Sequence, residues 1–446
     1  MDIRMKKNVC LLITSYTALL IFMILVIKGK NTLYADGSHH LMDMMLNPDH
    51  WYEYYNHRAG AMFLQYGFAF LALKVGVTSV KTLIDLCSFG YSFWIMFFYA
   101  ASLTACYHKK NFKLMYLGIL YFCFVLINSG FMPMISSNIT ASWFWCCFVY
   151  IYLYSSTSPK EEIFILLLSS IGIYINEYTI FLNIILLILV FSKKKQSELI
   201  FSKWWYFTLF ALFAGFVRGF DGTFIHQDID PGGDLLNCVK IPVPLLWSQI
   251  ISLALLLILL LISCKYSSVM ISNLLEFSVF VVCFACIWRI VQGVNVISYM
   301  SNIVRIYNLV IPIMLGCYLI LERKMKVNIQ EKYLALPAAT FLVCFLIYYS
   351  IATNDFQIYG SNTAQYCKDH EGFVARTELN YDWAYNWGWT AAEESILLQA
   401  YYGNQNVNCI ITDGEDDVAV ADVNIFYEKY DALHKYNIYI NHDLLK

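Results

Sequence analysis

The chain has 446 residues, of which 59% are hydrophobic and only 14% charged, with a formal net charge of −2 and a mean hydropathy of +0.56. Soluble domains carry roughly 25% charged residues, and a chain of this size needs a wettable exterior that this composition does not supply. These values exclude a soluble globular enzyme and predict a polytopic α-helical membrane protein. No basic stripe indicates a nucleic-acid partner.

Apolar runs of about 20 residues define the predicted membrane crossings. The first covers residues 9–27 and follows three basic residues, which places the N-terminus in the cytoplasm by the positive-inside rule. Residues 61–76 form a shorter run that Gln65 and Lys74 interrupt. We expect this run to be an interfacial or re-entrant helix, because a full crossing would place the basic stretch 108–113 outside.

With that assignment, lysine-rich loops fall on the cytoplasmic side of every later crossing. The sequence then predicts about 11 crossings in total, and the ten that follow the first are 88–107, 114–129, 138–156, 163–175, 178–192, 204–220, 244–263, 274–291, 303–321 and 333–352. The crossings 163–175 and 178–192 are short, so they are expected to form a partly embedded hairpin.

Three non-membrane segments lie outside in this topology: loop 29–60, loop 221–244 and the tail 353–446. The tail carries 15 acidic and 5 basic residues, whereas the rest of the chain is basic. We therefore predict two domains, a transmembrane domain over residues 1–352 and a small C-terminal domain over residues 353–446.

Three outer acids are candidates for chemistry. Asp36 and Asp43 lie in the first outer loop, and Glu177 falls at the tip of the short hairpin. A carboxylate held beside a sugar hydroxyl can accept its proton during attack. The alternative for Asp36 is a helix cap, and the alternative for Glu177 is an ordinary turn acid. For Glu177, two abbreviated passes around an acid also fit a role in lining a cavity.

Four arginines are predicted at or just inside the outer ends of helices: Arg58, Arg218, Arg289 and Arg305. Ionisable groups within a membrane span are costly and are candidates for function. The planar guanidinium fork suits a fixed phosphate contact, such as that of a lipid phosphate. The alternative is that each arginine reaches to headgroups or pairs with a carboxylate.

The histidines of the first outer loop (His39, His40, His50 and His57) fit no standard ligand spacing, so neither a metal nor a cofactor is expected. The tail segment 381–389 concentrates aromatic residues. Trp387 in this segment is a candidate for stacking on a sugar ring, with docking at the membrane interface as the alternative. Cys367 and Cys409 are the only cysteines of the tail, and an oxidising outer compartment predicts a disulfide between them.

The layout resembles the GT-C class of membrane glycosyltransferases. The resemblance rests on the sequence Tyr-Ala-Asp-Gly-Ser-His-His at residues 34–40, on the interfacial segment 58–76 and on the pattern of crossings. More narrowly, the chain is similar to bacterial serotype-converting O-antigen glucosyltransferases, which have a similar length and number of crossings. The class has a cytoplasmic N-terminus, an acidic residue in the first outer loop and often an outer C-terminal domain.

The resemblance implies a metal-independent, inverting sugar transfer at the periplasmic face of the bacterial inner membrane. The donor would be a polyprenyl-phosphate sugar, with glucose expected, and the acceptor an O-antigen or another glycan. Asp36 or Asp43 would take the acceptor proton, and Arg218, Arg289 or Arg305 would stabilise the departing phosphate. The alternatives are an O-antigen polymerase and a transporter of polysaccharide or lipid-linked sugar, although a transporter is expected to carry charges at mid-membrane depth.

Overall fold

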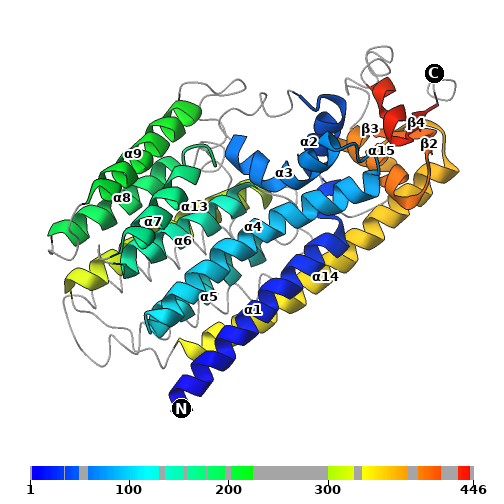
Figure 1. Ribbon diagram of the computed structural model, residues 1–446. Helices are drawn as coiled ribbons and strands as arrows, with labels where there is room; N and C mark the ends of the chain where they lie inside the picture. Colours follow the sequence, from blue (N-terminus) through cyan, green and yellow to red (C-terminus); the bar gives the residue numbers. More distant parts are fainter. Residues whose placement is uncertain are drawn as a thin grey trace.

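The computed structural model describes residues 3–34, 36–49, 59–129, 136–154, 158–176, 179–195, 202–224, 300–325, 334–379, 390–412 and 430–441. This part of the chain is mostly helical (Figure 1). Its first seven helices are α1 (Ile3–Gly29), α2 (Asp36–Leu46), α3 (Ala59–Lys74), α4 (Val80–His108), α5 (Phe112–Ser129), α6 (Ser136–Leu153) and α7 (Pro159–Ile171). The later helices are α8 (Thr179–Lys195), α9 (Lys203–Phe224), α13 (Met300–Met325), α14 (Ala335–Asp369) and α15 (Ala391–Tyr402).

Three of these helices are long and apolar enough to cross a bilayer: α1 from Met5, α4 and α14. Shorter apolar helices accompany them at Ala59–Lys74, Phe112–Leu126 and Ile311–Ile320. Together they indicate a helical, membrane-embedded protein, whereas the expected number of about 11 crossings remains a prediction. The predicted crossings 244–263 and 274–291 lie outside the described residues.

The helices form one bundle in which α1 lies along both α4 and α14, and α4 also packs on α3 and α6 (Figure 1). Helix α9 packs on both α7 and α8 at the other side of the bundle. Aromatic rings fill much of the interior: Phe22 of α1 meets Tyr349 of α14 edge to face at 5.0 Å between ring centroids, and Tyr121 of α5 stacks on Trp145 of α6 at 4.8 Å.

Large apolar side chains also point out of the bundle along several helices. Examples are Ile13 and Ile24 of α1, Phe210 of α9, and Val343 and Ile347 of α14, each more than half exposed. Water-exposed proteins do not carry apolar faces of this extent. Such faces are what contact with lipid requires.

Two helices are longer than the apolar runs that predicted them. Helix α4 begins at Val80, eight residues before the predicted crossing, because Ser79 caps its first turn by accepting from the Thr82 backbone amide. Helix α14 continues through residue 352 to Asp369, so the predicted domain boundary falls inside one helix. The apolar run ends at residue 352, but the helix continues because the C-terminal half of α14 packs on α15.

The C-terminal region adds short strands and 3₁₀ turns to α14 and α15. Strand β1 (Gly372–Ala375) pairs in parallel with β3 (Cys409–Thr412), and β2 (Asn406–Val407) pairs in parallel with β4 (Tyr439–Ile440). The 3₁₀ turns of this region are η5 (Arg376–Leu379) and η7 (Asp431–Tyr436), and a further 3₁₀ turn, η1 (Asn31–Leu33), follows α1. These elements and α2 gather at the end of the bundle away from the start of α1 (Figure 1).

Candidate functional site at the contact between α2 and α15

Helix α15 opens with two consecutive glutamates, Glu393 and Glu394, that are each only 5% exposed. Acids in the first turn of a helix are stabilised by the helix dipole. Glutamate is rarely buried to this extent unless it has partners. Because neighbouring side chains on a helix point about 100° apart, the two carboxylates face different elements.

Glu393 faces α2. Its Oε1 lies 3.2 Å from Nδ1 of His39, and it also accepts a hydrogen bond of 2.9 Å from the hydroxyl of Tyr430. A carboxylate beside Nδ1 favours the histidine form that carries a proton on that nitrogen. His39 keeps 20% of its side chain exposed, whereas only 6% of the Glu393 side chain is exposed. The contact therefore orients a partly accessible imidazole with a buried acid.

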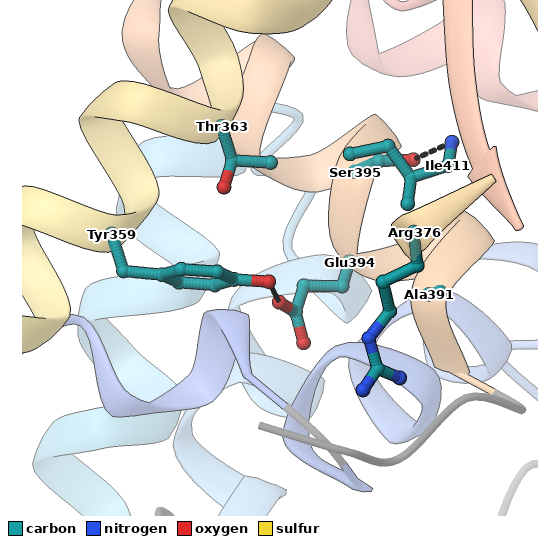
Figure 2. Close-up of a pocket in the computed structure, with 7 residues that line it drawn as sticks. All are labelled: Tyr359, Thr363, Arg376, Ala391, Glu394, Ser395 and Ile411. Atoms are coloured by element: carbon teal, nitrogen blue, oxygen red, sulfur yellow. Dashed lines mark hydrogen bonds between the residues drawn. The ribbon is translucent and has the colours of Figure 1, made fainter. Parts of the chain in front are cut away.

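Glu394 faces α14. Its Oε1 accepts a 2.7 Å hydrogen bond from the hydroxyl of Tyr359, and the carboxylate lines a pocket together with Arg376, Thr363 and Ser395 (Figure 2). The pocket is small: its free volume of about 10 Å³ has room for about one water molecule. The first turn of α15 therefore places one carboxylate against α2 and the other in the wall of this pocket.

Helix α2 is held on its other side by α3. The His40 ring packs edge-on against Tyr66 of α3 at 5.7 Å between centroids. Gly37 permits the close return of the chain after η1, since a Cβ there would lie 2.8 Å from the Thr32 carbonyl oxygen. The helix that carries Asp36 and Asp43 is thus fixed between α3 and the C-terminal helix α15.

The three predicted acids differ in how much of each the structure describes. Asp36 is the first residue of α2, but its side chain lies outside the described part, so the choice between helix cap and base stays a prediction. Asp43 is half-buried in α2, where its Oδ1 accepts from the Asn47 side chain at 3.1 Å. Glu177 lies outside the described residues.

Among the predicted arginines, the structure gives the contacts of Arg218. Its Nη1 donates to Oδ2 of Asp221 at 3.1 Å, one turn away on α9, and its guanidinium lies 5.6 Å from the centroid of the Tyr174 ring. The Tyr174 carbonyl accepts from the backbone amide of Gly60 at 2.7 Å, which joins the hairpin tip to the start of α3. Arg218 thus pairs with a carboxylate, which is the alternative to the phosphate contact expected from the sequence.

The other predicted binding residues cannot be placed in the same way. Arg305 belongs to α13, but its side chain lies outside the described part of the chain. Arg58, Arg289 and Trp387 lie outside the described residues altogether.

A second buried polar cluster crosses the interior between α4, α6 and α13. The amide nitrogen of Asn308 donates to Ser137 Oγ at 2.8 Å and to Asn138 Oδ1 at 2.7 Å, and Asn138 in turn donates to the Tyr91 hydroxyl at 2.5 Å. All four side chains are buried. Hydrogen bonds between buried side chains fix the register of membrane helices, so we assign this cluster to helix packing.

The predicted disulfide is not formed. Cys367 and Cys409 are brought together, but both are free, buried thiols. The Cys367 side chain hydrogen-bonds to Cys409, and this bond lowers the pKa of Cys409 below its ordinary value. The two cysteines of the tail do lie together as expected, but the predicted bond is wrong: the bonding state depends on redox conditions, which a sequence does not contain.

Several residues of the site are not among those predicted from the sequence: Glu393, Glu394, Tyr359, Tyr430 and Arg376. Two acids just before the apolar run 396–398 do mark a helix N-terminus. That signal does not distinguish a solvated first turn from a buried one. Within the described residues, no three His, Cys, Asp or Glu side chains come together as a metal site would require.

Comparison with known proteins finds no matching family model, no matching curated protein and no matching solved structure. The candidate site therefore has to be interpreted from its own geometry.

Proposed function

We propose that this protein transfers a sugar from a polyprenyl-phosphate donor to a glycan acceptor at the outer face of the bacterial inner membrane. The observation that carries the proposal is the contact between α2 and α15, in which Glu393 lies 3.2 Å from His39. This contact gathers acids, a histidine and tyrosine hydroxyls at one end of an apolar helical bundle. A polar constellation beside a membrane domain suits a reaction between a lipid-borne donor and a water-borne acceptor.

The chemistry assigned to the site is an inverting displacement. The acceptor hydroxyl loses its proton to a carboxylate of α2, Asp36 or Asp43, and its oxygen bonds to the anomeric carbon. The bond from that carbon to the phosphate oxygen breaks, and the polyprenyl phosphate leaves with the electron pair. Positive groups near the leaving phosphate lower the barrier, and Arg218, Arg289 and Arg305 are the candidates for that role.

The described contacts refine the choice of acid. Asp43 is engaged with Asn47 on its own helix, whereas Asp36 opens α2 three residues before His39. Because Asp43 already has a partner on α2, Asp36 is our first choice as the base. We further propose a cytoplasmic N-terminus and a periplasmic C-terminus, with the lipid bilayer, the polyprenyl-phosphate donor and an O-antigen or another glycan as partners.

The test is sugar transfer by variants of the α2 acid. Asp36→Asn keeps the size of the side chain but cannot accept the proton, so transfer should fall by about 10²-fold or more. If Asp36 only caps α2, asparagine caps nearly as well and transfer should persist. O-antigen modification in cells, read with serotype-specific serum, reports transfer, and immunoblotting of membranes reports insertion.

The matched control is Asp49→Asn. Asp49 is an exposed acid of the same loop that forms an ion pair with Lys74, and its loss should leave transfer unchanged. Near-normal O-antigen modification by a variant with Asp36→Asn, Asp43→Asn and Glu177→Gln together would contradict the glycosyltransferase proposal.

A further inference from the structure

The three helices long enough to cross a bilayer, α1, α4 and α14, change from apolar to polar at one level of the bundle. Lys30, which follows α1, forms an ion pair with Asp85, which precedes the long apolar part of α4. The Gln357 amide, past the apolar part of α14, donates to the Lys28 carbonyl of α1 at 3.0 Å. Because these contacts align the ends of three apolar runs, they mark a boundary of the bilayer, on the side where α15 packs (Figure 1).

Two lysines meet at this level on the ring of Tyr401, which lies in the last turn of α15. The Lys30 ammonium lies 5.4 Å from the centroid of that ring, and the Lys81 ammonium lies 5.7 Å from it. Lys30 comes from the turn after α1, whereas Lys81 comes from the first turn of α4. The packing of α15 on α4 therefore gathers two positive charges around one aromatic side chain at the bilayer boundary.

The charges of this cluster do not balance. Asp85 pairs with Lys30, whereas Lys81 is exposed and forms no ion pair with any described residue. Asp355, an acid of α14 near this level, pairs with neither lysine. Lys81 also lies at the N-terminal end of α4, where the helix dipole disfavours a cation. Two lysines against one carboxylate leave one net positive charge, so a group with a single negative charge would neutralise the cluster.

An aromatic ridge on α4 continues from this cluster into the apolar part of the bundle. Its members, Phe89, Phe93 and Phe97, follow Asp85 at intervals of four residues, which makes each the neighbour of the next on the helix surface. The ring centroids lie 5.4 Å apart for Phe89 and Phe93 and 6.4 Å apart for Phe93 and Phe97. All three rings are at least partly exposed, and Phe68 of α3 packs edge-on against the first two. This ridge offers contact to a hydrocarbon chain next to the charged cluster.

The cluster is separate from the contact between α2 and α15. Tyr401 follows Glu393 by eight residues, which is about 12 Å along the axis of α15. The phosphate of a reacting donor has to lie at the proposed reaction site beside α2, whereas the phosphate of a bilayer lipid has no such requirement. This separation favours a phospholipid of the surrounding bilayer over the sugar donor as the occupant.

We propose that Lys30, Lys81 and the ring of Tyr401 form a binding site for the phosphate of an anionic phospholipid, and that the aromatic ridge of α4 holds one of its acyl chains. The phosphate oxygens accept from the two ammonium groups, which a phosphodiester with one negative charge neutralises. A lipid bound there contacts α1, α4 and α15, so it ties the C-terminal region to the membrane surface. The site involves no sugar transfer and does not rest on the proposed function.

The experiment is native mass spectrometry of the full chain, released from detergent micelles after titration with phosphatidylglycerol or phosphatidylcholine. The two lipids carry the same acyl chains, but only the first has a net negative charge. We expect phosphatidylglycerol to bind more tightly by about fivefold or more. Lys81→Gln should weaken its binding by about fivefold, the effect of one lysine at a lipid surface, and Lys81→Arg should retain it.

Lys368→Gln is the matched control for charge. Lys368 is also an exposed lysine without an ion pair to any described residue, but it lies in the last turn of α14, about 24 Å along the helix from residue 352. Its loss should leave phospholipid binding unchanged. In detergent without added lipid, Lys81→Gln should melt at the temperature of the unaltered chain, because the Lys81 side chain is exposed and unpaired among the described residues.

Photo-crosslinking locates the bound lipid. Phosphatidylglycerol with a diazirine on one acyl chain should label peptides of α3 and α4 that contain Phe68 or the aromatic ridge. Lys81→Gln should reduce this labelling, and Lys368→Gln should not.

Four results would overturn the site: equal affinity for the two lipids, equal binding by Lys81→Gln and Lys368→Gln, labelling confined to other helices, or displacement of phosphatidylglycerol by an equal concentration of undecaprenyl phosphate. The last result would assign the cluster to the donor lipid instead. A chain that binds phosphatidylglycerol as expected but transfers no sugar contradicts the proposed function alone.

Discussion

The hydroxyl of Tyr436 donates a 2.9 Å hydrogen bond to the backbone carbonyl oxygen of Met45, 391 positions earlier in the chain. Tyr436 lies in η7 and is 9% exposed, and Met45 lies in the last turn of α2. The last carbonyls of a helix have no partner within the helix. Tyr436 therefore completes the C-terminal end of α2 from the far end of the sequence.

Removal of this hydroxyl should loosen α2. Tyr436→Phe leaves a buried carbonyl without its partner and should cost about 1–3 kcal/mol of stability, measured as a lower melting temperature in detergent. Tyr439→Phe is the control, because Tyr439 is 48% exposed and the substitution should have little effect. Equal melting temperatures for the two variants would contradict the role assigned to Tyr436.

The same tyrosine predicts an alkaline effect. Burial raises the pKa of Tyr436, so the folded protein holds the neutral phenol more strongly than the unfolded chain does. Its contribution is fully present below the ordinary tyrosine pKa of about 10 and is lost as pH rises beyond it. A melting curve series from pH 8 to 11 should show a shallower decline for Tyr436→Phe than for the unaltered chain.

The contact between Glu393 and His39 should appear as a coupling energy. Contacting polar groups show interaction free energies of roughly 0.5–3 kcal/mol in double-mutant cycles. We expect Glu393→Gln and His39→Gln to be non-additive in melting experiments. As a control, Glu393→Gln and His434→Gln should add, since the His434 ring contacts the Asp431 carbonyl and not α15. An additive result for the first pair would show that the two side chains do not interact in solution.

Lys193 should be essential for the stability of the bundle where α6 and α8 end. It is 2% exposed, and its ammonium donates to the carbonyl oxygens of Ile151, Tyr152 and Tyr154 at 2.8, 3.2 and 2.7 Å. Positive charge at a helix C-terminus is favourable, and here it satisfies the last carbonyls of α6. Lys193→Met should destabilise the protein by about 3 kcal/mol or more.

Lys195→Met provides the comparison for Lys193. Lys195 belongs to the same lysine run at the end of α8 but is exposed. When both variants are unfolded by heat in the same detergent, Lys193→Met should have a lower melting temperature than the unaltered chain, and Lys195→Met should not. A similar decrease for both would point to the loss of charge in general.

The proposed orientation in the membrane predicts the activity of reporter fusions. Alkaline phosphatase fused after Lys110 should be inactive and fused after Lys446 should be active, because the enzyme matures only outside the cytoplasm. Lys110 follows α4, and the start of α1 lies near the same turn because the Tyr116 hydroxyl donates to Asn8. Reversed activities would overturn the orientation and every outer site assigned from it.

The sequence by itself determined the class of the protein and the approximate place of most helices. Hydropathy located α1, α5, α8 and α9 to within a few residues, because the bilayer makes a long apolar run detectable without knowledge of its neighbours. Hydropathy could not detect the first two turns of α4 or the C-terminal half of α14. Lys81 and Asp85 interrupt the apolar residues at the start of α4, which Ser79 caps, and the polar C-terminal half of α14 packs on α15.

Only the tertiary structure decided which polar residues share a site. Asp36 was noticed because its place after the first crossing is visible in the sequence, whereas Glu393 lies 354 positions from His39 and looks like any acid of a first helical turn. Burial and partnership result from the folding of distant segments onto each other. Local sequence does not encode them, which is why the pairing of α2 with α15 and the pocket beside Glu394 emerged only from the fold.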